Sequence, residues 1–189
     1  MCIRDSSNDD GVTAPGIRNL VNQMKRLGEV VVVAPDKPQS AMGHAITIGH
    51  PLRLNRVDIF DGVEAYKCSG TPADCVKIAK HHVLHDRRPD LVVSGINHGS
   101  NSSVNVIYSG TMSAAIEAAM EGLPAIGFSL DEFGEDADFS HCLDYVYSIA
   151  KNILENPQKP GVALNVNFPI KKDEAIKGIK ICRQANAKW

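Results

Sequence analysis

Short apolar runs alternate with amphipathic segments along most of this 189-residue chain. The run Val30 to Ala34 is apolar at every position, which is typical of a strand buried on both faces of a parallel sheet. Before this run, apolar residues recur at helical spacing, from Pro15 at the expected helix start as far as Gly28. The chain is therefore predicted to form an α/β fold, in which helices cover both faces of a mostly parallel sheet. The remaining predicted helices cover residues 72–85, 112–121 and 139–154, and the remaining strands cover residues 91–93, 124–130 and 162–166.

One part of the chain departs from this alternation. Residues 45–54 and 63–68 form extended patterns with no helix between them, which predicts a hairpin or an excursion at the sheet edge. The length of the chain and its 43% hydrophobic content support one well-buried core, so we expect a single domain over residues 1–189. Residues 1–6 are atypical of a buried first strand, because Arg4 and Asp5 interrupt the apolar run.

The composition argues against a nucleic acid or a membrane as partner. The formal net charge is -2, and the lysines and arginines are scattered rather than gathered in a basic run. The first residues show no basic-then-apolar signal, and no apolar run approaches the roughly 20 residues that span a bilayer, so we expect a cytoplasmic protein with a small-molecule ligand. The five cysteines lack a CxxC pair, and we expect reduced, mostly buried thiols.

The turn Ser7-Asn8-Asp9-Asp10-Gly11 places two adjacent carboxylates where the first strand should lead into the first helix. Taken alone, the motif is better explained as an ordinary polar turn, because Asn, Asp and Gly are common turn residues. Two carboxylates this close repel each other, however, unless one is protonated or a cation lies between them. A divalent metal bound by Asp9 and Asp10 is the simplest interpretation.

Polar side chains also follow the later strands. In open α/β sheets ligands bind outside the carboxyl ends of the strands. Ser40 lies in the turn after the strand 30–34, and Asn97 and Asn101 lie after the strand 91–93. Their amide and hydroxyl oxygens, together with the carboxylates, suit Mg²⁺ or Mn²⁺, whereas zinc would favour His or Cys ligands.

The histidines are assigned smaller roles. His98 follows Asn97, and we expect it to line the site or to form a hydrogen bond rather than to bind metal. His44 is the best remaining candidate for a histidine of the site. His81, His82 and His85 lie on or at the end of a predicted helix and should be solvated.

The segment Tyr108-Ser109-Gly110-Thr111 precedes a predicted helix rich in small residues, whose buried face should include Met112 and Met120. A helix N-terminus presents unpaired backbone N–H groups and the positive end of the helix dipole, so hydroxyls and a glycine there can bind phosphate. A plain N-cap is the favoured explanation of this turn by itself. Four polar turns on one sheet edge favour a phosphate site.

Several familiar catalytic motifs are missing from the sequence. It contains no GxGxxG, no GxxxxGK[ST], no GxSxG and no HExxH. These absences argue against a dinucleotide enzyme, a P-loop NTPase, an α/β-hydrolase and a zinc protease. Metal-assisted phosphoryl chemistry is the reaction class that remains.

With these residues assembled, the chain resembles the SurE family, the stationary-phase survival proteins that act as metal-dependent 5'/3'-nucleotidases. The resemblance extends from Ser7 to the end of the chain. It rests on six blocks in the same order, SNDDGVTAPG (7–16), VAPD (33–36), GHAIT (43–47), SGTPADCV (69–76), SGINHGSN (94–101) and YSGTMSAA (108–115).

The resemblance implies a fold, a metal site and a substrate. The implied fold is a Rossmann-like three-layer α/β sandwich with a mostly parallel sheet and a protruding hairpin, in subunits that form homodimers or homotetramers. The implied cofactor is one Mg²⁺ or Mn²⁺ per subunit. Its ligands would be Asp9, Asp10, Ser40 and Asn97. Relative to the family pattern, residues 1–6 replace an apolar strand, and we expect a further C-terminal section to be missing after Trp189.

The predicted function is hydrolysis of nucleoside 5'- and 3'-monophosphates to nucleoside and phosphate, with acid-phosphatase-type activity as an extension. We expect catalytic roles for Asp9, Asp10 and Asn101. The predicted contacts to substrate or phosphate come from Asn8, Gly95, Asn101, Ser109, Gly110 and Thr111. Two alternatives are a non-catalytic metal-dependent module that binds nucleotide or phosphate, and a metal-dependent sugar transferase, for which no aromatic or acidic sugar pocket is evident.

Overall fold

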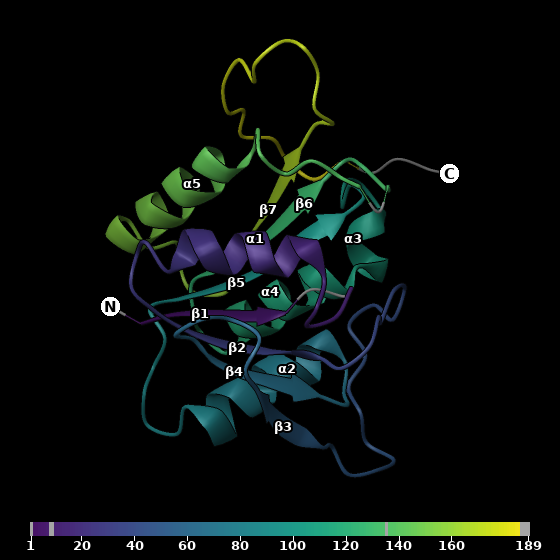
Figure 1. Cartoon of the computed structure of the whole chain (residues 1–189), viewed down its shortest axis with the longest axis vertical. Coiled ribbons are helices and arrows are strands. Elements are labelled where there is room, and N and C mark those ends of the chain that lie inside the picture. The colour runs from purple at the N-terminus through teal and green to yellow at the C-terminus, as the bar shows by residue number, and fades with distance from the viewer. Residues whose placement is uncertain (1, 8–9, 135, 186–189) are drawn as a thin grey trace.

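A seven-stranded sheet forms the centre of the computed structural model, which describes residues 2–7, 10–134 and 136–185 (Figure 1). The strand order is β3-β4-β2-β1-β5-β6-β7, and every neighbouring pair in it is parallel except β3 and β4. The strands are β1 (Cys2–Ser7), β2 (Glu29–Pro35), β3 (Leu54–Val57), β4 (Glu64–Cys68), β5 (Leu91–His98), β6 (Ala125–Leu130) and β7 (Ala163–Phe168).

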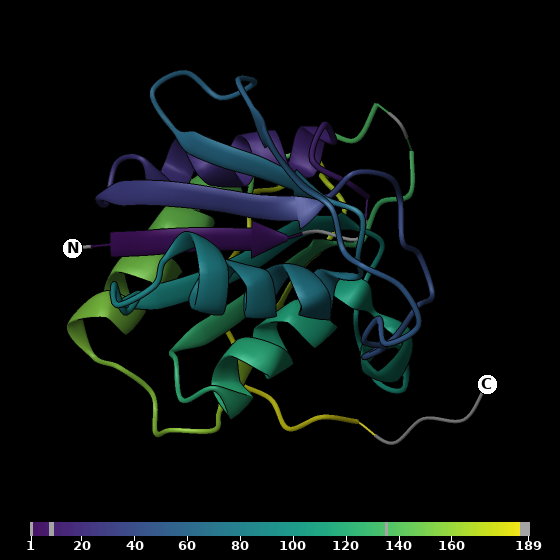
Figure 2. The same cartoon turned by 90° about the horizontal axis from the view of Figure 1, so that it is seen from below.

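Helices cover both faces of this sheet, as the alternating pattern predicts (Figures 1 and 2). One face carries α1 (Pro15–Met24) and α5 (Leu143–Glu155), and the other carries α2 (Pro72–Ile78) and α4 (Gly110–Met120). The strand β2 is buried on both sides, since Val32 packs toward α1 while Val33 packs beside Cys75 of α2. Two short elements complete the set, the π-helical turn η1 (Ala79–Val83) and the helix α3 (Asn105–Tyr108).

The chain reverses direction across the sheet between β1 and β5. From β1 it proceeds to β2 and the β3–β4 pair on one side, and then from β5 to β6 and β7 on the other side. The loops that follow β1 and β5 therefore diverge, and such a switch point leaves a crevice at the carboxyl edge of the sheet. Figure 2 shows the arrowheads of β1 and β2 pointing to the same end, beside the long loop that follows β2.

Most predicted elements are confirmed, and three details are wrong. The hairpin is confirmed as the antiparallel pair β3–β4, but residues 45–53 are irregular rather than extended strand. The strand predicted over 91–93 continues to His98, so Ser94 to His98 lie inside β5 and not in a turn after it. Met120 was expected on the buried face of α4, yet it is 71% exposed.

The thiols and the histidines of the second helical segment agree with expectation. Cys68, Cys75 and Cys142 are free and buried, and Cys182 is free and exposed. Burial raises the pKa of the Cys142 thiol to about 12. His81, His82 and His85 are exposed. Within residues 10–134 and 136–185, every helix is too short or too polar to cross a membrane.

Candidate active site

Asp10 lies three residues after β1 ends, at the carboxyl edge of the sheet. Its Oδ2 atom is buried and has no hydrogen-bond partner among the described residues. Burial raises the pKa of this carboxyl, and the His98 imidazole and the backbone N–H of His98 partly oppose that rise. A buried, unpaired carboxylate oxygen is costly in the absence of a cation, so this atom is suited to a metal ion.

Asn97 lies beside Asp10, on the strand next to β1. The hydrogen bond between Asp10 and the His98 N–H places the carboxylate next to the end of β5. The Asn97 side chain is buried, and its amide nitrogen donates to the Gly99 carbonyl at 2.8 Å. The amide oxygen is therefore the atom that could bind a metal. Asn8 and Asp9, the other predicted residues of this turn, lie outside the described residues.

Ser40 is exposed in the loop after β2. This loop passes close to the Asp10 turn, because a Cβ atom on Gly11 would lie 3.4 Å from the backbone of Lys37. Further along, the Gly43 N–H donates to the Tyr108 carbonyl at 3.1 Å. The loop thus extends from the carboxylate turn to the turn before α4, although no contact within the described residues joins Ser40 itself to Asp10.

The predicted phosphate turn opens α4 as expected. Ser109 is its N-cap, and the Ser109 hydroxyl accepts a hydrogen bond from the Met112 N–H at 3.0 Å. Gly110 is the first helical residue, and the Thr111 side chain is fully buried in the first turn. N–H groups in a first helical turn lack partners within the helix and attract anions. Ser109 therefore caps α4. The binding of phosphate by Gly110 and Thr111 stays a prediction.

This prediction can be tested by replacing Thr111 with valine, which keeps the volume and removes the hydroxyl. We expect inhibition by inorganic phosphate to weaken about tenfold, the cost of one hydrogen bond to a charged group. Gly110→Leu should block the approach of phosphate to the backbone. Ser113→Ala is the matched control, because the Ser113 hydroxyl donates to the Ser109 carbonyl within the helix. Unchanged phosphate inhibition in both site variants would reduce this turn to an ordinary cap.

Asn101 is held by polar residues of β6 and β7. Its side-chain amide donates to the Ser129 hydroxyl at 2.8 Å. Its backbone N–H donates to the Asn167 side chain at 2.8 Å, and its carbonyl accepts from the Asn165 side chain at 2.7 Å. Ser129 and Asn167 lie at the carboxyl ends of β6 and β7, and Asn165 lies in the middle of β7. The sequence reasoning missed all three. Asn101 is buried and fixed at the edge of the site.

Gly95 lies within β5, and its close surroundings require glycine. Its φ is +123°, and an added Cβ would lie 2.3 Å from the Phe128 carbonyl oxygen of β6. The close packing of β5 on β6 thus explains why residue 95 is a glycine. Its predicted phosphate contact stays a prediction.

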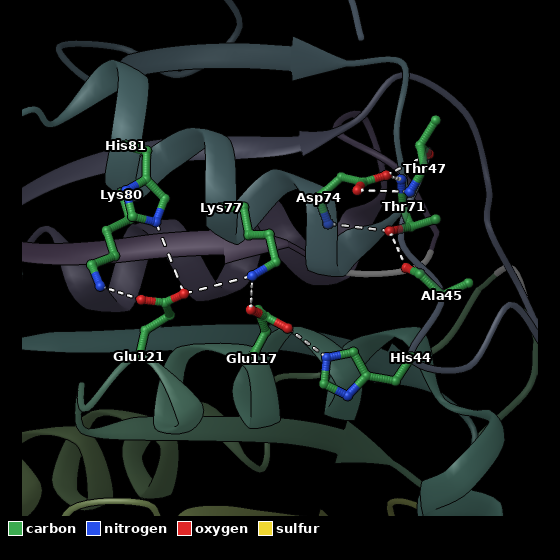
Figure 3. Close-up of polar contacts among 10 residues, drawn as sticks. All are labelled: His44, Ala45, Thr47, Thr71, Asp74, Lys77, Lys80, His81, Glu117 and Glu121. Atoms are coloured by element: carbon green, nitrogen blue, oxygen red, sulfur yellow. Dashed lines mark hydrogen bonds and ion pairs between the residues drawn. The ribbon is translucent and has the colours of Figure 1, made fainter. Parts of the chain in front are cut away.

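The two candidate histidines behave differently. The His98 ring stacks on Phe139 with 5.3 Å between the ring centroids, and its Nε2 is buried without a hydrogen-bond partner among the described residues. His44 Nε2 lies 2.7 Å from Oε2 of Glu117 on α4 (Figure 3). Glu117 is a buried charge that the sequence reasoning missed. Its only sequence signal is an acidic residue within a helix of small residues.

With this geometry established, comparison with known proteins identifies the family. A model of the family described as "Survival protein SurE" matches residues 6–189. The chain belongs to this family. It is 66% identical over 182 residues to the 5'-nucleotidase SurE of Cytophaga hutchinsonii, and this match covers 96% of this chain and 70% of that protein. The corresponding protein of Chlorobaculum tepidum is 42% identical, with 96% and 68% covered.

A solved structure gives the same result for the fold. The crystal structure of a SurE protein from Aquifex aeolicus matches with a TM-score of 0.86 at 40% sequence identity, and the match covers 97% of this chain and 72% of that chain. The predicted SurE resemblance and the Rossmann-like α/β fold are both confirmed.

The described residues fit a hard divalent cation. Residues 10–134 and 136–185 contain no cluster of three His, Cys, Asp or Glu side chains that could hold a metal. The available donors are the unpaired carboxylate oxygen of Asp10 and the amide oxygen of Asn97, with the Ser40 hydroxyl in the loop nearby. A site made of oxygen atoms suits Mg²⁺ or Mn²⁺ better than Zn²⁺.

Proposed function

We propose that this chain is a metal-dependent 5'-nucleotidase, a phosphomonoesterase that hydrolyses nucleoside 5'- and 3'-monophosphates to nucleoside and phosphate. The observation that carries the proposal is the buried, unpaired Asp10 oxygen beside Asn97 at the switch point of the sheet. The relatives named 5'-nucleotidase SurE support the same activity.

The metal would be one Mg²⁺ or Mn²⁺ per subunit, held by Asp9, Asp10, Ser40 and Asn97. Such an ion supplies positive charge that stabilises the phosphoryl oxygens as the ester bond breaks.

The chain's own residues would orient the substrate. Asn101 is fixed by Ser129 of β6 and by Asn167 of β7. One N–H of its side-chain amide donates to Ser129, and the second N–H would donate to a phosphoryl oxygen. The first turn of α4 offers backbone N–H groups to the same phosphate. Donors that are held before the reaction stabilise developing negative charge without reorganisation.

Phosphate release tests the proposal directly. The protein is incubated with a panel of nucleoside 5'- and 3'-monophosphates, with and without excess chelator. Chelation should abolish phosphate release, and Mg²⁺ or Mn²⁺ should restore it better than Zn²⁺, because all the proposed ligands are oxygens. Full activity in excess chelator would refute the metal site. Binding of nucleotide without phosphate release would mean a binding module instead.

Three further features stay predictions of the sequence. These are the single domain over residues 1–189, the homodimer or homotetramer, and the cytoplasmic location. Gel filtration with light scattering would measure the oligomeric state.

A further inference from the structure

The buried carboxylate of Glu117 lies between two basic side chains. His44 Nε2 is 2.7 Å from one carboxylate oxygen, and Lys77 Nζ of α2 is 2.5 Å from the other (Figure 3). The Glu117 side chain is only 5% exposed, whereas His44 is 31% exposed. A carboxylate this buried needs its partners, because an unpaired buried charge is strongly destabilising. Glu117, which lies on α4, therefore fixes the position of the His44 side chain.

The residues that follow His44 are held as firmly. Asp74, near the start of α2, accepts hydrogen bonds from the Thr47 N–H at 3.0 Å and from the Thr47 hydroxyl at 2.6 Å. The Thr71 hydroxyl donates to the Ala45 carbonyl at 2.7 Å (Figure 3). The segment 44–47 is thus attached to both helices on this face of the sheet.

The loop before His44 leads to the proposed active site. Ser40 precedes His44 by four residues, and Gly43 between them is bonded to the Tyr108 carbonyl. Tyr108 in turn precedes Ser109, the cap of the proposed phosphate turn. Glu117 follows Gly110 by seven residues, or about two helical turns. One helix therefore carries both the phosphate turn and the carboxylate that anchors the Ser40 loop.

We propose that His44 and Glu117 are positioning residues for the metal site. Their contact holds the loop 39–43 against the start of α4, so that Ser40 keeps a fixed place relative to Asp10 and to the phosphate turn. His44 then acts through the loop and not on the substrate, since its Nε2 is bonded to Glu117. The inference rests on the proposed function, because it takes Ser40 as a metal ligand.

The test compares three variants by Mn²⁺ binding and by kinetics. His44→Ala removes the contact between the loop and α4. His44→Gln keeps a side-chain N–H that can donate to Glu117. Lys77→Met removes the other ion pair of the same carboxylate and leaves the loop contact intact. The dissociation constant of Mn²⁺ is measured by electron paramagnetic resonance of the free ion, which does not depend on turnover.

We expect His44→Ala to raise the Mn²⁺ dissociation constant about tenfold or more, the scale seen when a residue that orients a metal ligand is lost. The KM for nucleotide should rise with it, while kcat at saturating Mn²⁺ falls much less. His44→Gln should restore binding to within about threefold, because it keeps the hydrogen bond. Lys77→Met should lower the melting temperature without changing Mn²⁺ binding.

Different failures are distinguishable. A wild-type protein that releases no phosphate with Mn²⁺ overturns the proposed function and this inference with it. If the wild type is active and His44→Ala binds Mn²⁺ as tightly, the positioning role is wrong and the proposed function stands. Equal losses of Mn²⁺ affinity in His44→Ala and Lys77→Met would show general loosening of α4 and would also overturn the positioning role.

Discussion

Replacing Asp10 by asparagine should lower kcat/KM for nucleotide hydrolysis roughly 100-fold or more while the protein stays folded. Asparagine keeps the shape of the side chain and an oxygen that can accept the His98 N–H, but it removes the charge that a metal ion needs. Asp9→Asn is expected to have the same effect on activity. The measurements are phosphate release at several Mn²⁺ concentrations and circular dichroism of each variant.

The stability of the Asp10→Asn variant distinguishes a metal ligand from a structural residue. Burial raises the pKa of Asp10 in the metal-free fold. A carboxyl whose pKa is higher in the folded than in the unfolded state makes folding less favourable once the pH exceeds its unfolded pKa. The neutral variant should therefore melt at the same temperature as the metal-free wild type, or higher. Mn²⁺ should raise the melting temperature of the wild type and not that of the variant, because a ligand stabilises only the state that binds it.

Asp61→Asn is the control for the loss of one negative charge, because Asp61 is exposed in the loop between β3 and β4. It should change neither activity nor the stabilisation by Mn²⁺. Near-normal turnover of Asp10→Asn with an unchanged circular dichroism spectrum would remove Asp10 from the metal site.

Local patterns were sufficient to predict the sheet and most of the helices. The run Val30 to Ala34 predicts β2 because its side chains pack on both faces of the sheet, Val32 in one core cluster and Val33 in another. The predicted helix start at residue 72 is confirmed, because a capping box begins α2 there and the Thr71 hydroxyl accepts from the Asp74 N–H. Such signals depend on residues a few positions apart, so they are visible in the sequence.

Features that depend on distant partners were not predictable in this way. The predicted strand 91–93 is shorter than β5, because Ser94 and Asn97 are polar and indicate a turn. Both residues are buried in the structure, and the Asn97 side chain donates to the Gly99 carbonyl. The contact between Glu117 and His44 was not predictable, since the two residues are 73 positions apart. Ser129 and Asn167 support Asn101 only because the parallel strands β6 and β7 bring their carboxyl ends to one edge. Only the fold brings these groups together.

Gly95→Ala should cause a large loss of stability. The new Cβ would lie 2.3 Å from the Phe128 carbonyl oxygen, so β5 would have to separate from β6, and the φ of +123° is itself unfavourable for alanine. We expect a cost of about 3 kcal/mol or more, which corresponds to a fall of roughly 10 °C in melting temperature for a chain of this size.

Gly62→Ala separates the clash from the backbone conformation. Gly62 also has a positive φ, +68°, but no atom lies within 4 Å of an added Cβ. Its alanine variant should lose only about 1 kcal/mol, the cost of the left-handed conformation alone. If Gly95→Ala melts like Gly62→Ala yet no longer binds phosphate, the glycine is required by the ligand and not by the packing of β5 on β6. If Gly95→Ala melts far lower and the remaining folded protein still binds phosphate at low temperature, strand packing is the reason for the glycine. The added methyl group would then act by separating β5 from β6 and not by blocking the phosphate.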